Sequence, residues 1–260
     1  MNAIVTGARK GIGRAIVEKF IKNGINVWAC TSHIDDAFMQ NLKELSENEG
    51  YVVTDSVTQN DSWIMPIELD LRNEESIKDA VKKIYSAKDS EGKRLSVDIL
   101  VNNAGVSSSG MMQMTSMDTL RDVMEVNFIG QMSLIQGISK MMIRQKAGSI
   151  VNIGSVGGIE AREGYLAYGS SKAAFMWATR CISKELAPYN IRVNAVAPGL
   201  VETDMGNTKS DEEQQKILNA ISMKRKGTPE EIAEVVYFLA TDASSFITGS
   251  IINVDGGRLI

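Results

Sequence analysis

Tyr168 and Lys172 stand four residues apart in the segment YGSSK, and the residues between them are small. Positions i and i+4 share one face of a helix, so the phenol and the ammonium group are expected to lie together. A tyrosine with its ordinary pKa of about 10 keeps its proton at neutral pH, whereas a nearby cation favours the phenolate. The pair therefore predicts a phenol that can give or take a proton. Of the six tyrosines only Tyr168 has a lysine four residues later, and Ser155 precedes it across a glycine-rich connection that could bring all three together.

A second group of residues is suited to binding phosphate. The segment TGARKGIG, residues Thr6–Gly13, follows an apolar run and opens a helical pattern. Gly7 would permit a tight turn, Gly11 the close approach of backbone to a pyrophosphate, and Gly13 close packing of the helix on the strand. Free N–H groups at the start of the helix would favour an anion. Three glycines alone also make ordinary turns, but three in this position predict a dinucleotide-binding site.

The end of the second strand bears on which dinucleotide binds. NAD-binding chains usually carry an acidic residue there, which holds the ribose 2′-hydroxyl. In VWACTSH that position is Thr31, followed by Ser32, and small hydroxyl residues leave room for a 2′-phosphate. Arg9 and Lys10 can supply charge-assisted bonds to this phosphate, and the alternative is that they are solvated loop charges. The pattern predicts NADP(H), and the acidic pair at 35–36 leaves NAD(H) open.

Two amide side chains end a further strand in ILVNNAG, residues Ile99–Gly105. In parallel α/β sheets ligands bind outside the carboxyl ends of the strands, and Asn102 and Asn103 would lie in that crevice. Paired asparagines also occur in plain turns, so the pattern alone leaves both alternatives open. IVNIGS ends in the same way at Ser155.

The elements that must position these residues alternate along the chain. Short apolar runs rich in Val and Ile predict strands buried on both faces, and the amphipathic segments between them predict helices. The predicted strands are Ala3–Val5, Val27–Cys30, Ile64–Leu69, Ile99–Val101, Ser149–Ile153, Arg192–Ala195 and Ile251–Val254. The predicted helices are Ile12–Asn23, Glu74–Ser86, Met117–Gln145, Tyr168–Leu186 and Pro229–Ala240. This alternation predicts a single α/β domain over residues 1–260, a Rossmann-type doubly wound fold with a seven-stranded, mostly parallel sheet flanked by helices.

Composition argues against several classes of protein. The 260 residues carry a formal net charge of −4, so no basic footprint for nucleic acid is present. No apolar run is long enough to span a bilayer and no signal peptide is recognised, so no membrane association and a cytoplasmic location are expected. Cys30 and Cys181 are expected to be buried thiols, and neither they nor the single His33 predicts a metal site. Residues 34–62 and 86–96 interrupt the alternation and are expected to be surface insertions.

Taken together, these motifs resemble those of the classical short-chain dehydrogenase/reductase family over essentially the whole chain. The resemblance is carried by TGARKGIG, NNAG, Asn127, Ser155, YGSSK and PGLVETDM. Within the family, GARKGIGRAI, VDILVNNAG, IGSVGG and the closing ITGSIINVDGG are most similar to 3-oxoacyl-(acyl-carrier-protein) reductases. The resemblance implies an NADP(H)-dependent oxidoreductase that reduces a ketone to a secondary alcohol, with a 3-oxoacyl thioester as the expected substrate. A sugar, steroid or secondary-metabolite ketone or alcohol is the alternative substrate. A nucleotide-sensing module is a third hypothesis, but such a module would not need the reacting groups.

The resemblance also implies roles for individual residues. Tyr168 would be the general acid, Lys172 would lower the pKa of Tyr168 and bind the nicotinamide ribose, and Ser155 would bind the substrate carbonyl. Asn127 would hold a water that links Lys172 to solvent. The cofactor would be held by Gly7, Arg9, Lys10, Gly11, Ile12, Gly13, Thr31, Ser32, Asp70, Leu71, Asn103, Ala104, Gly105, Tyr168, Lys172, Pro198, Gly199, Val201 and Thr203.

Fewer residues point to the substrate. Arg162 and Tyr165, in the loop before Tyr168, could line the substrate pocket together with Ser155. The family's mobile substrate lid would correspond to residues 200–226, which are charged and carry no acyl-specific pattern.

The resemblance also bears on partners. An acyl carrier protein is a candidate, because Lys146 matches one basic position near the entrance in those reductases. At the other position Tyr189 stands where an arginine is expected; Arg180 and Lys184 could compensate or be solvated helix charges. The family commonly forms homotetramers, which makes a homotetramer the expected assembly.

Overall fold

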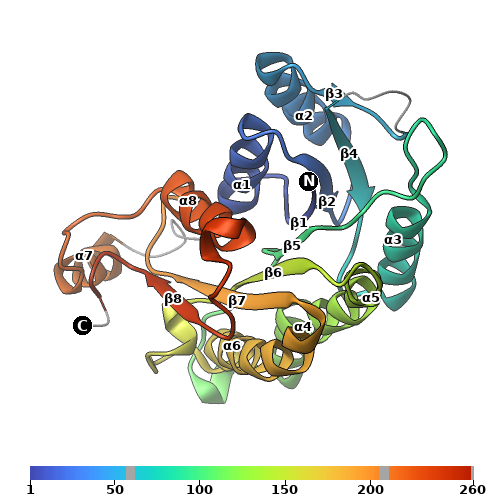
Figure 1. The fold of residues 1–260 in the computed structure, drawn as a ribbon. Helices are drawn as coiled ribbons and strands as arrows, with labels where there is room; N and C mark the ends of the chain where they lie inside the picture. Colours follow the sequence, from blue (N-terminus) through green and yellow to red (C-terminus); the bar gives the residue numbers. More distant parts are fainter. Residues whose placement is uncertain (57–61, 205–210, 259–260) are drawn as a thin grey trace.

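The computed structural model describes residues 1–56, 62–204 and 211–258, which form one sheet with helices on both faces (Figure 1). The strands are β1 (Asn2–Thr6), β2 (Asn26–Thr31), β3 (Val52–Val53), β4 (Trp63–Glu68), β5 (Ile99–Asn102), β6 (Gly148–Ile153), β7 (Ile191–Pro198) and β8 (Ile251–Val254). The α-helices are α1 (Gly11–Lys22), α2 (Asp36–Glu49), α3 (Glu74–Ser86), α4 (Met117–Met124), α5 (Gly130–Gln145), α6 (Leu166–Leu186), α7 (Asp211–Ala220) and α8 (Pro229–Ala240).

The strand order is β3-β4-β2-β1-β5-β6-β7-β8, and each neighbouring pair is parallel. The order from β4 to β7 is that of a doubly wound Rossmann sheet, which reverses direction between β1 and β5. The described part of the chain has eight strands, so the predicted number of seven was wrong. The additional strand is β3, whose two residues Val52 and Val53 lie at the edge of the sheet and are not fully buried. So short a strand produces no apolar run that a sequence pattern could reveal.

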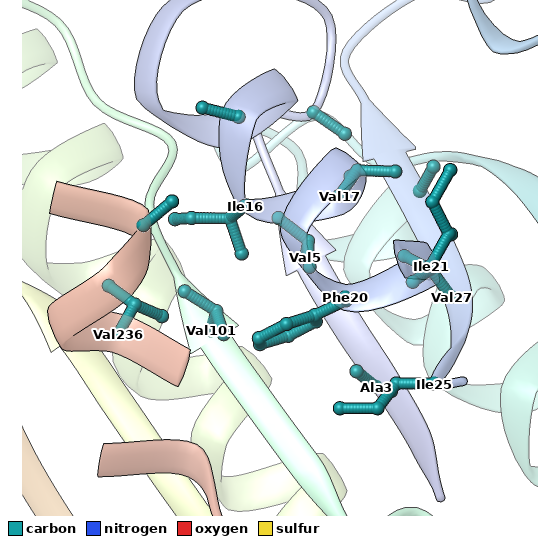
Figure 2. Close-up of a cluster of buried hydrophobic side chains, with 14 of the residues drawn as sticks. Ala3, Val5, Ile16, Val17, Phe20, Ile21, Ile25, Val27, Val101 and Val236 are labelled. Atoms are coloured by element: carbon teal, nitrogen blue, oxygen red, sulfur yellow. The ribbon is translucent and has the colours of Figure 1, made fainter. Parts of the chain in front are cut away.

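Helices α1, α2 and α8 cover one face of the sheet, and Figure 2 shows part of this core. Ile16, Val17, Phe20 and Ile21 recur at helical spacing, so α1 presents one apolar face to the strands. Phe20 and Ile16 lie against strand residues such as Val5 and Val101, and Val236 reaches the same cluster from α8. Burying α1 in this way fixes its first turn at the end of β1.

Helices α3, α5 and α6 cover the other face, with Ile77, Leu134 and Phe175 in the core. Residues 117–145, predicted as one helix, comprise α4, a π-helical turn at Glu125–Ile129 and α5. The stretch is continuous, but the π-turn changes its winding at Asn127.

The predicted insertions and lid acquire structure of their own. Residues 34–62 contain α2 and β3, and residues 57–61 lie outside the described residues. The predicted insertion at residues 86–96 starts at the last residue of α3 and lies in the loop before β5, where Lys88 and Arg94 pair in an isolated antiparallel β-bridge. In the predicted lid, a parallel bridge joins Val201 to Gly227 before α8, α7 lies within the segment, and residues 205–210 fall outside the description. Of the described helices, none has the length and apolar character needed to cross a membrane.

Candidate active site

A cleft of about 850 Å³ opens along the carboxyl ends of the central strands. Its walls come from the turn after β1, the ends of β2, β4, β5 and β6, the first turns of α6 and the segment after β7. β1 and β5 flank the point at which the strand order reverses, which is where doubly wound sheets bind ligands. The cleft is large enough for an extended ligand such as a dinucleotide.

Almost all of the predicted site residues line this cleft. They are Gly7, Arg9, Lys10, Gly11, Ile12, Thr31, Ser32, Asp70, Leu71, Asn103, Ala104, Gly105, Ser155, Arg162, Tyr165, Tyr168, Lys172, Pro198, Gly199, Val201 and Thr203. Gly13 and Asn127 are not part of the lining. Gly13 packs behind the turn after β1, and the buried Asn127 lies behind Gly105.

The turn between β1 and α1 has the geometry of a phosphate cradle. Gly7 and Gly11 have φ values of 65° and 57°, which side-chain-bearing residues rarely adopt. A Cβ on Gly13 would lie 2.1 Å from the Gly7 carbonyl oxygen, so only glycine lets α1 begin this close to the turn. Lys10, at the N-cap of α1, makes no side-chain cap hydrogen bond, and the first turn contains no acidic residue. The first N–H groups of α1 are therefore available to an anion, which fits the pyrophosphate of a dinucleotide.

Thr6 fastens the end of β1 to the end of β5. Its hydroxyl donates to the Val101 carbonyl at 3.4 Å and accepts from the backbone N–H groups of Asn103 and Ala104, both at 2.9 Å. The Asn103 amide donates to the carbonyls of Thr6 and Gly7 at 2.9 and 3.3 Å. The side-chain nitrogen of Asn103 therefore holds the glycine turn in place.

Asn102 does not lie in the crevice where the sequence placed it. It is fully buried and its Nδ2 donates to Asn152 Oδ1 at 2.8 Å. Asn152 Nδ2 donates in turn to the Thr179 hydroxyl at 2.9 Å, and that hydroxyl donates to the Phe175 carbonyl at 3.0 Å. Buried amides thus connect β5 and β6 to the helix that carries Tyr168.

Tyr168 projects from the first turns of α6 into the cleft beside Ser155 and Tyr165. The Tyr165 and Tyr168 rings meet edge to face with centroids 5.9 Å apart. Burial raises the pKa of the Tyr168 phenol; the Ser155 hydroxyl, by hydrogen bonding to the phenol, opposes this, and Tyr165 adds a smaller increase. Tyr168 is therefore protonated at neutral pH. Ser155 follows β6, and its Oγ accepts from the Gly157 N–H at 3.0 Å, which fixes the hydroxyl in the cleft wall.

Lys172 is buried one turn after Tyr168, and its Nζ donates to the Ile153 carbonyl at 2.8 Å. Burial lowers the pKa of Lys172 to about 8. The expected lowering of the Tyr168 pKa by Lys172 is not what the structure shows: the phenol pKa is raised, and Lys172 is not among the groups that shift it. The spacing of the two residues was informative, but spacing cannot indicate how strongly burial acts on each group.

Asn127 sits in the π-helical turn, and its amide bonds to the loop that follows β5. Its Oδ1 accepts from the Val106 N–H at 2.8 Å, and its Nδ2 donates to the Val106 carbonyl at 2.9 Å and to the Ser171 hydroxyl at 3.0 Å. Both amide hydrogens are therefore engaged. The side chain joins the cleft wall to α6, and the role of holding a water stays a prediction.

The two basic residues predicted to hold a 2′-phosphate are both ion-paired. Arg9 Nη1 bonds both oxygens of Asp35 at 2.9 Å, and its Nη2 donates to the His33 carbonyl at 2.6 Å. The Arg9 guanidinium also lies 5.4 Å from the Phe38 ring centroid. Lys10 pairs with Asp204 at 2.6 Å, but both side chains are exposed, so this pair is weak. Lys10 is therefore free to exchange partners at little cost, whereas Arg9 is held by several contacts.

Two residues at the substrate end, Glu160 and Arg258, were not singled out from the sequence, and they contact each other. Arg162 donates to Glu160 Oε2 from Nε at 3.0 Å and from Nη2 at 2.5 Å, and its guanidinium lies 5.6 Å from the Tyr165 ring centroid. Arg258, near the end of the chain, donates from Nε to the same carboxylate oxygen at 3.1 Å. Glu160 and Arg258 are 98 positions apart, so no local pattern could have linked them.

The cysteines and possible metal ligands lie elsewhere. Cys30 is buried, and burial raises the pKa of its thiol to about 12. Cys181 is exposed, so its prediction as a buried thiol was wrong; it falls on the solvent face of α6. Within the described ranges no cluster of His, Cys, Asp or Glu could hold a metal ion.

Comparison with known proteins gives matches over nearly the whole chain. Residues 7–258 match a family model described as "Enoyl-(Acyl carrier protein) reductase". The 3-oxoacyl-[acyl-carrier-protein] reductase of Aquifex aeolicus is 38% identical, with the match covering 98% of this chain and 96% of the relative. The corresponding reductase of Thermotoga maritima is 36% identical and covers 99% of this chain and 97% of its own length.

Solved structures with the same fold agree with the sequence matches. A protein from Agrobacterium tumefaciens, provisionally described as a gluconate dehydrogenase, has a TM-score of 0.87 at 29% identity, over 99% of this chain and 95% of its own. A 3-oxoacyl-[acyl-carrier protein] reductase from Brucella melitensis has a TM-score of 0.85 at 30% identity, over 100% of this chain and 91% of its own. With the sheet order and the cleft described above, these matches place the chain in the short-chain dehydrogenase/reductase family, whose members are oxidoreductases.

Proposed function

We propose that this oxidoreductase uses NADPH to reduce a ketone to a secondary alcohol, and that its substrate is a 3-oxoacyl thioester. The observation that carries the proposal is the convergence of the Tyr168 phenol, the Ser155 hydroxyl and the glycine turn on one cleft. A dinucleotide bound there would supply a hydride to the carbonyl carbon. A protonated phenol beside that carbon is what reduction requires, because the oxygen must gain a proton.

The chain's own residues would bind the carbonyl and deliver this proton. The Ser155 and Tyr168 hydroxyls would both donate to the carbonyl oxygen, where negative charge develops. Tyr168 would then pass its proton to that oxygen. Lys172 would hold the nicotinamide ribose hydroxyls, and Asn127 and Ser171 would keep the first turns of α6 aligned with the loop after β5. In this scheme Asn127 is a positioning residue.

The names of the relatives support the thioester, but they differ on the bond that is reduced. The curated relatives are named as 3-oxoacyl reductases, whereas the family model is described as an enoyl reductase. NADPH oxidation should therefore be measured with acetoacetyl-pantetheine and with crotonyl-pantetheine, which carry a ketone and a carbon–carbon double bond respectively. Turnover of the first alone supports the proposal. Turnover of the second alone would contradict it.

A polar ketone is the second candidate substrate. One structural relative is described as a gluconate dehydrogenase, a name that indicates a sugar acid as its substrate. In this chain the charged side chains of Arg162 and Arg258 line the cleft, and Glu160 adjoins it. Turnover of other ketones with no turnover of acetoacetyl thioesters would replace the thioester and leave the proposed chemistry intact.

Cofactor preference should respond to the Arg9–Asp35 pair. Asp35→Asn removes the carboxylate that holds Arg9 but keeps an N-cap residue for α2, because asparagine caps as well as aspartate. We expect the NADPH-over-NADH ratio of kcat/KM to rise about fivefold, since the freed guanidinium can pair with the 2′-phosphate. Asp118→Asn, which breaks an exposed pair with Arg121 away from the cleft, is the control. An unchanged ratio in Asp35→Asn would place Arg9 away from that phosphate.

The pH profile should report the ionisation of Lys172. The ammonium form is present below the folded pKa of about 8 and is lost as the pH rises through it. Because kcat/KM for the cofactor reports groups of the free enzyme, it should fall on the alkaline side with a midpoint near pH 8. Lys172→Arg keeps its charge at higher pH, so the residual activity of this variant should lose that limb. A limb of the same midpoint in both proteins would assign it to another group.

Partners and location follow from the same proposal. An acyl carrier protein would deliver the thioester near the exposed Lys146, although the exposed Tyr189 offers no charge at the second expected position. A homotetramer would cover exposed apolar side chains such as Trp177 on α6. A cytoplasmic site of action stays a prediction.

A further inference from the structure

Glu160, Arg162 and Arg258 form a charged cluster at the substrate end of the cleft. Both arginines line the cleft, and both bond the same carboxylate oxygen of Glu160. Their guanidinium groups lower the pKa of Glu160, so its carboxylate is ionised at neutral pH. Two cations facing one anion leave a net charge of +1 in the cluster.

Arg258 has unused hydrogen-bonding capacity. Its side chain is only 8% exposed, and a guanidinium carries five N–H donors. Among the described residues its one hydrogen-bond partner is Glu160, reached through Nε. The Nη1 and Nη2 groups therefore have no acceptor within the described part of the chain. Arg258 lines the cleft, so these N–H groups can bond water or a ligand that enters it. An acceptor group on a ligand would engage donors that the chain itself leaves unused.

The cluster is close to the reacting end of the cleft. Arg162 contacts the Tyr165 ring at 5.6 Å, and that ring contacts the Tyr168 ring with centroids 5.9 Å apart. A ligand whose ketone oxygen meets Tyr168 could therefore extend past Tyr165 and place another of its groups against the arginines. An arginine fork matches a carboxylate or a phosphate with two parallel hydrogen bonds.

We propose that Arg258, assisted by Arg162, binds an anionic group of the substrate, a carboxylate or a phosphate, and so selects charged over neutral ketones. This inference rests on the proposed ketone reductase function and adds the charge of the substrate to it. A carboxylate would belong to a small oxo acid, and a phosphate to the pantetheine arm of an acyl thioester.

Two matched substrate pairs test the proposal with saturating NADPH. The first is levulinate with methyl levulinate, and the second is acetoacetyl-4′-phosphopantetheine with acetoacetyl-pantetheine. In the wild-type chain the charged member of at least one pair should have the lower KM. In Arg258→Gln that preference, the ratio of kcat/KM for the charged to the neutral member, should fall about tenfold or more. Arg258→Lys should retain part of it, because lysine keeps the charge but not the fork.

Arg121→Gln is the matched control, since Arg121 forms an exposed pair with Asp118 and does not line the cleft. The pair that responds identifies the source of the anion. A charged-over-neutral ratio that is equal in wild type and Arg258→Gln for both pairs would overturn the inference, while turnover of the neutral ketones would still support the reductase.

Direct binding separates the two proposals if no ketone is reduced. Glutarate and 4′-phosphopantetheine can be titrated calorimetrically into wild type and Arg258→Gln in the presence of NADP⁺. Weaker binding of one probe to the variant supports the anion site even without turnover. Equal binding of both probes to the two proteins would overturn it.

Discussion

Replacing Tyr168 with phenylalanine should lower kcat for ketone reduction by about 10²- to 10⁴-fold, which is the usual contribution of a positioned general acid. Burial raises the pKa of this phenol, so the wild-type chain has a proton to deliver at neutral pH. Phenylalanine keeps the edge-to-face ring contact with Tyr165 but has no proton and no donor for the carbonyl oxygen. Dinucleotide binding, followed by the fluorescence of NADPH, should weaken far less than kcat falls, because the other residues expected to hold the cofactor are unchanged.

Tyr189→Phe removes a hydroxyl from an exposed tyrosine outside the cleft and is the control. The raised pKa of Tyr168 also gives the two reaction directions different pH dependences. Oxidation of the alcohol needs the phenolate, so its rate should increase with pH over a range where reduction does not. Turnover retained in Tyr168→Phe would assign the proton to another group and contradict the proposed mechanism.

Gly13→Ala should abolish tight dinucleotide binding and destabilise the fold. The added Cβ would lie 2.1 Å from the Gly7 carbonyl oxygen and 2.5 Å from Asn103 Nδ2. Backbone cannot yield as a flexible side chain can, so α1 must move away from the turn. We expect a loss of about 1–3 kcal/mol in the free energy of unfolding, as for other overpacked sites. Since ~1 kcal/mol corresponds to ~2–4 °C for a chain of this size, Tm should fall by several degrees.

Gly227→Ala is a matched control, because its Cβ would meet Glu231 Oε2 at an ordinary 3.6 Å. The two variants add the same methyl group, so a difference between them isolates the contact with the turn. Calorimetric unfolding and NADPH titration measure the two effects separately. Normal binding of NADPH by Gly13→Ala would show that the turn after β1 does not hold the pyrophosphate.

Much of this fold follows from the sequence because its strands are buried on both faces. Runs such as Ile99–Val101 are apolar throughout and bounded by polar residues. Six of the seven predicted runs lie within a strand of the sheet, and Ile64–Leu69 passes the end of β4 by one residue. β3 escaped prediction because Val52 and Val53 are too few to make a run. The π-turn at Asn127 also escaped, since its residues are compatible with an uninterrupted helix.

The candidate site likewise has features that the sequence predicts and features that it does not. Residues that follow strands or share a helix turn, such as Ser155, Tyr168 and Lys172, can be placed together from their spacing. The spacing of residues does not show how deeply each side chain is buried. The pKa of Tyr168 is therefore shifted upward by burial, whereas a downward shift was expected. The contact between Glu160 and Arg258 exists only because the chain end returns to the loop before α6, which three-dimensional folding alone reveals.

The buried pair Asn102–Asn152 has a consequence for how the chain assembles. β5 and β6 are short and apolar on both faces, so hydrophobicity alone would tolerate a slip of one strand along the other. The two asparagines are register partners, and a slip by one residue would pair Asn102 with Val151 or Ile153 and break its hydrogen bond to Asn152. Each unpaired amide would cost about 1–3 kcal/mol. The pair therefore favours the observed register of β5 and β6 over a shifted one. Thr179 extends this selection to α6, because its hydroxyl can accept from the Asn152 amide only when α6 packs on a sheet with the correct register.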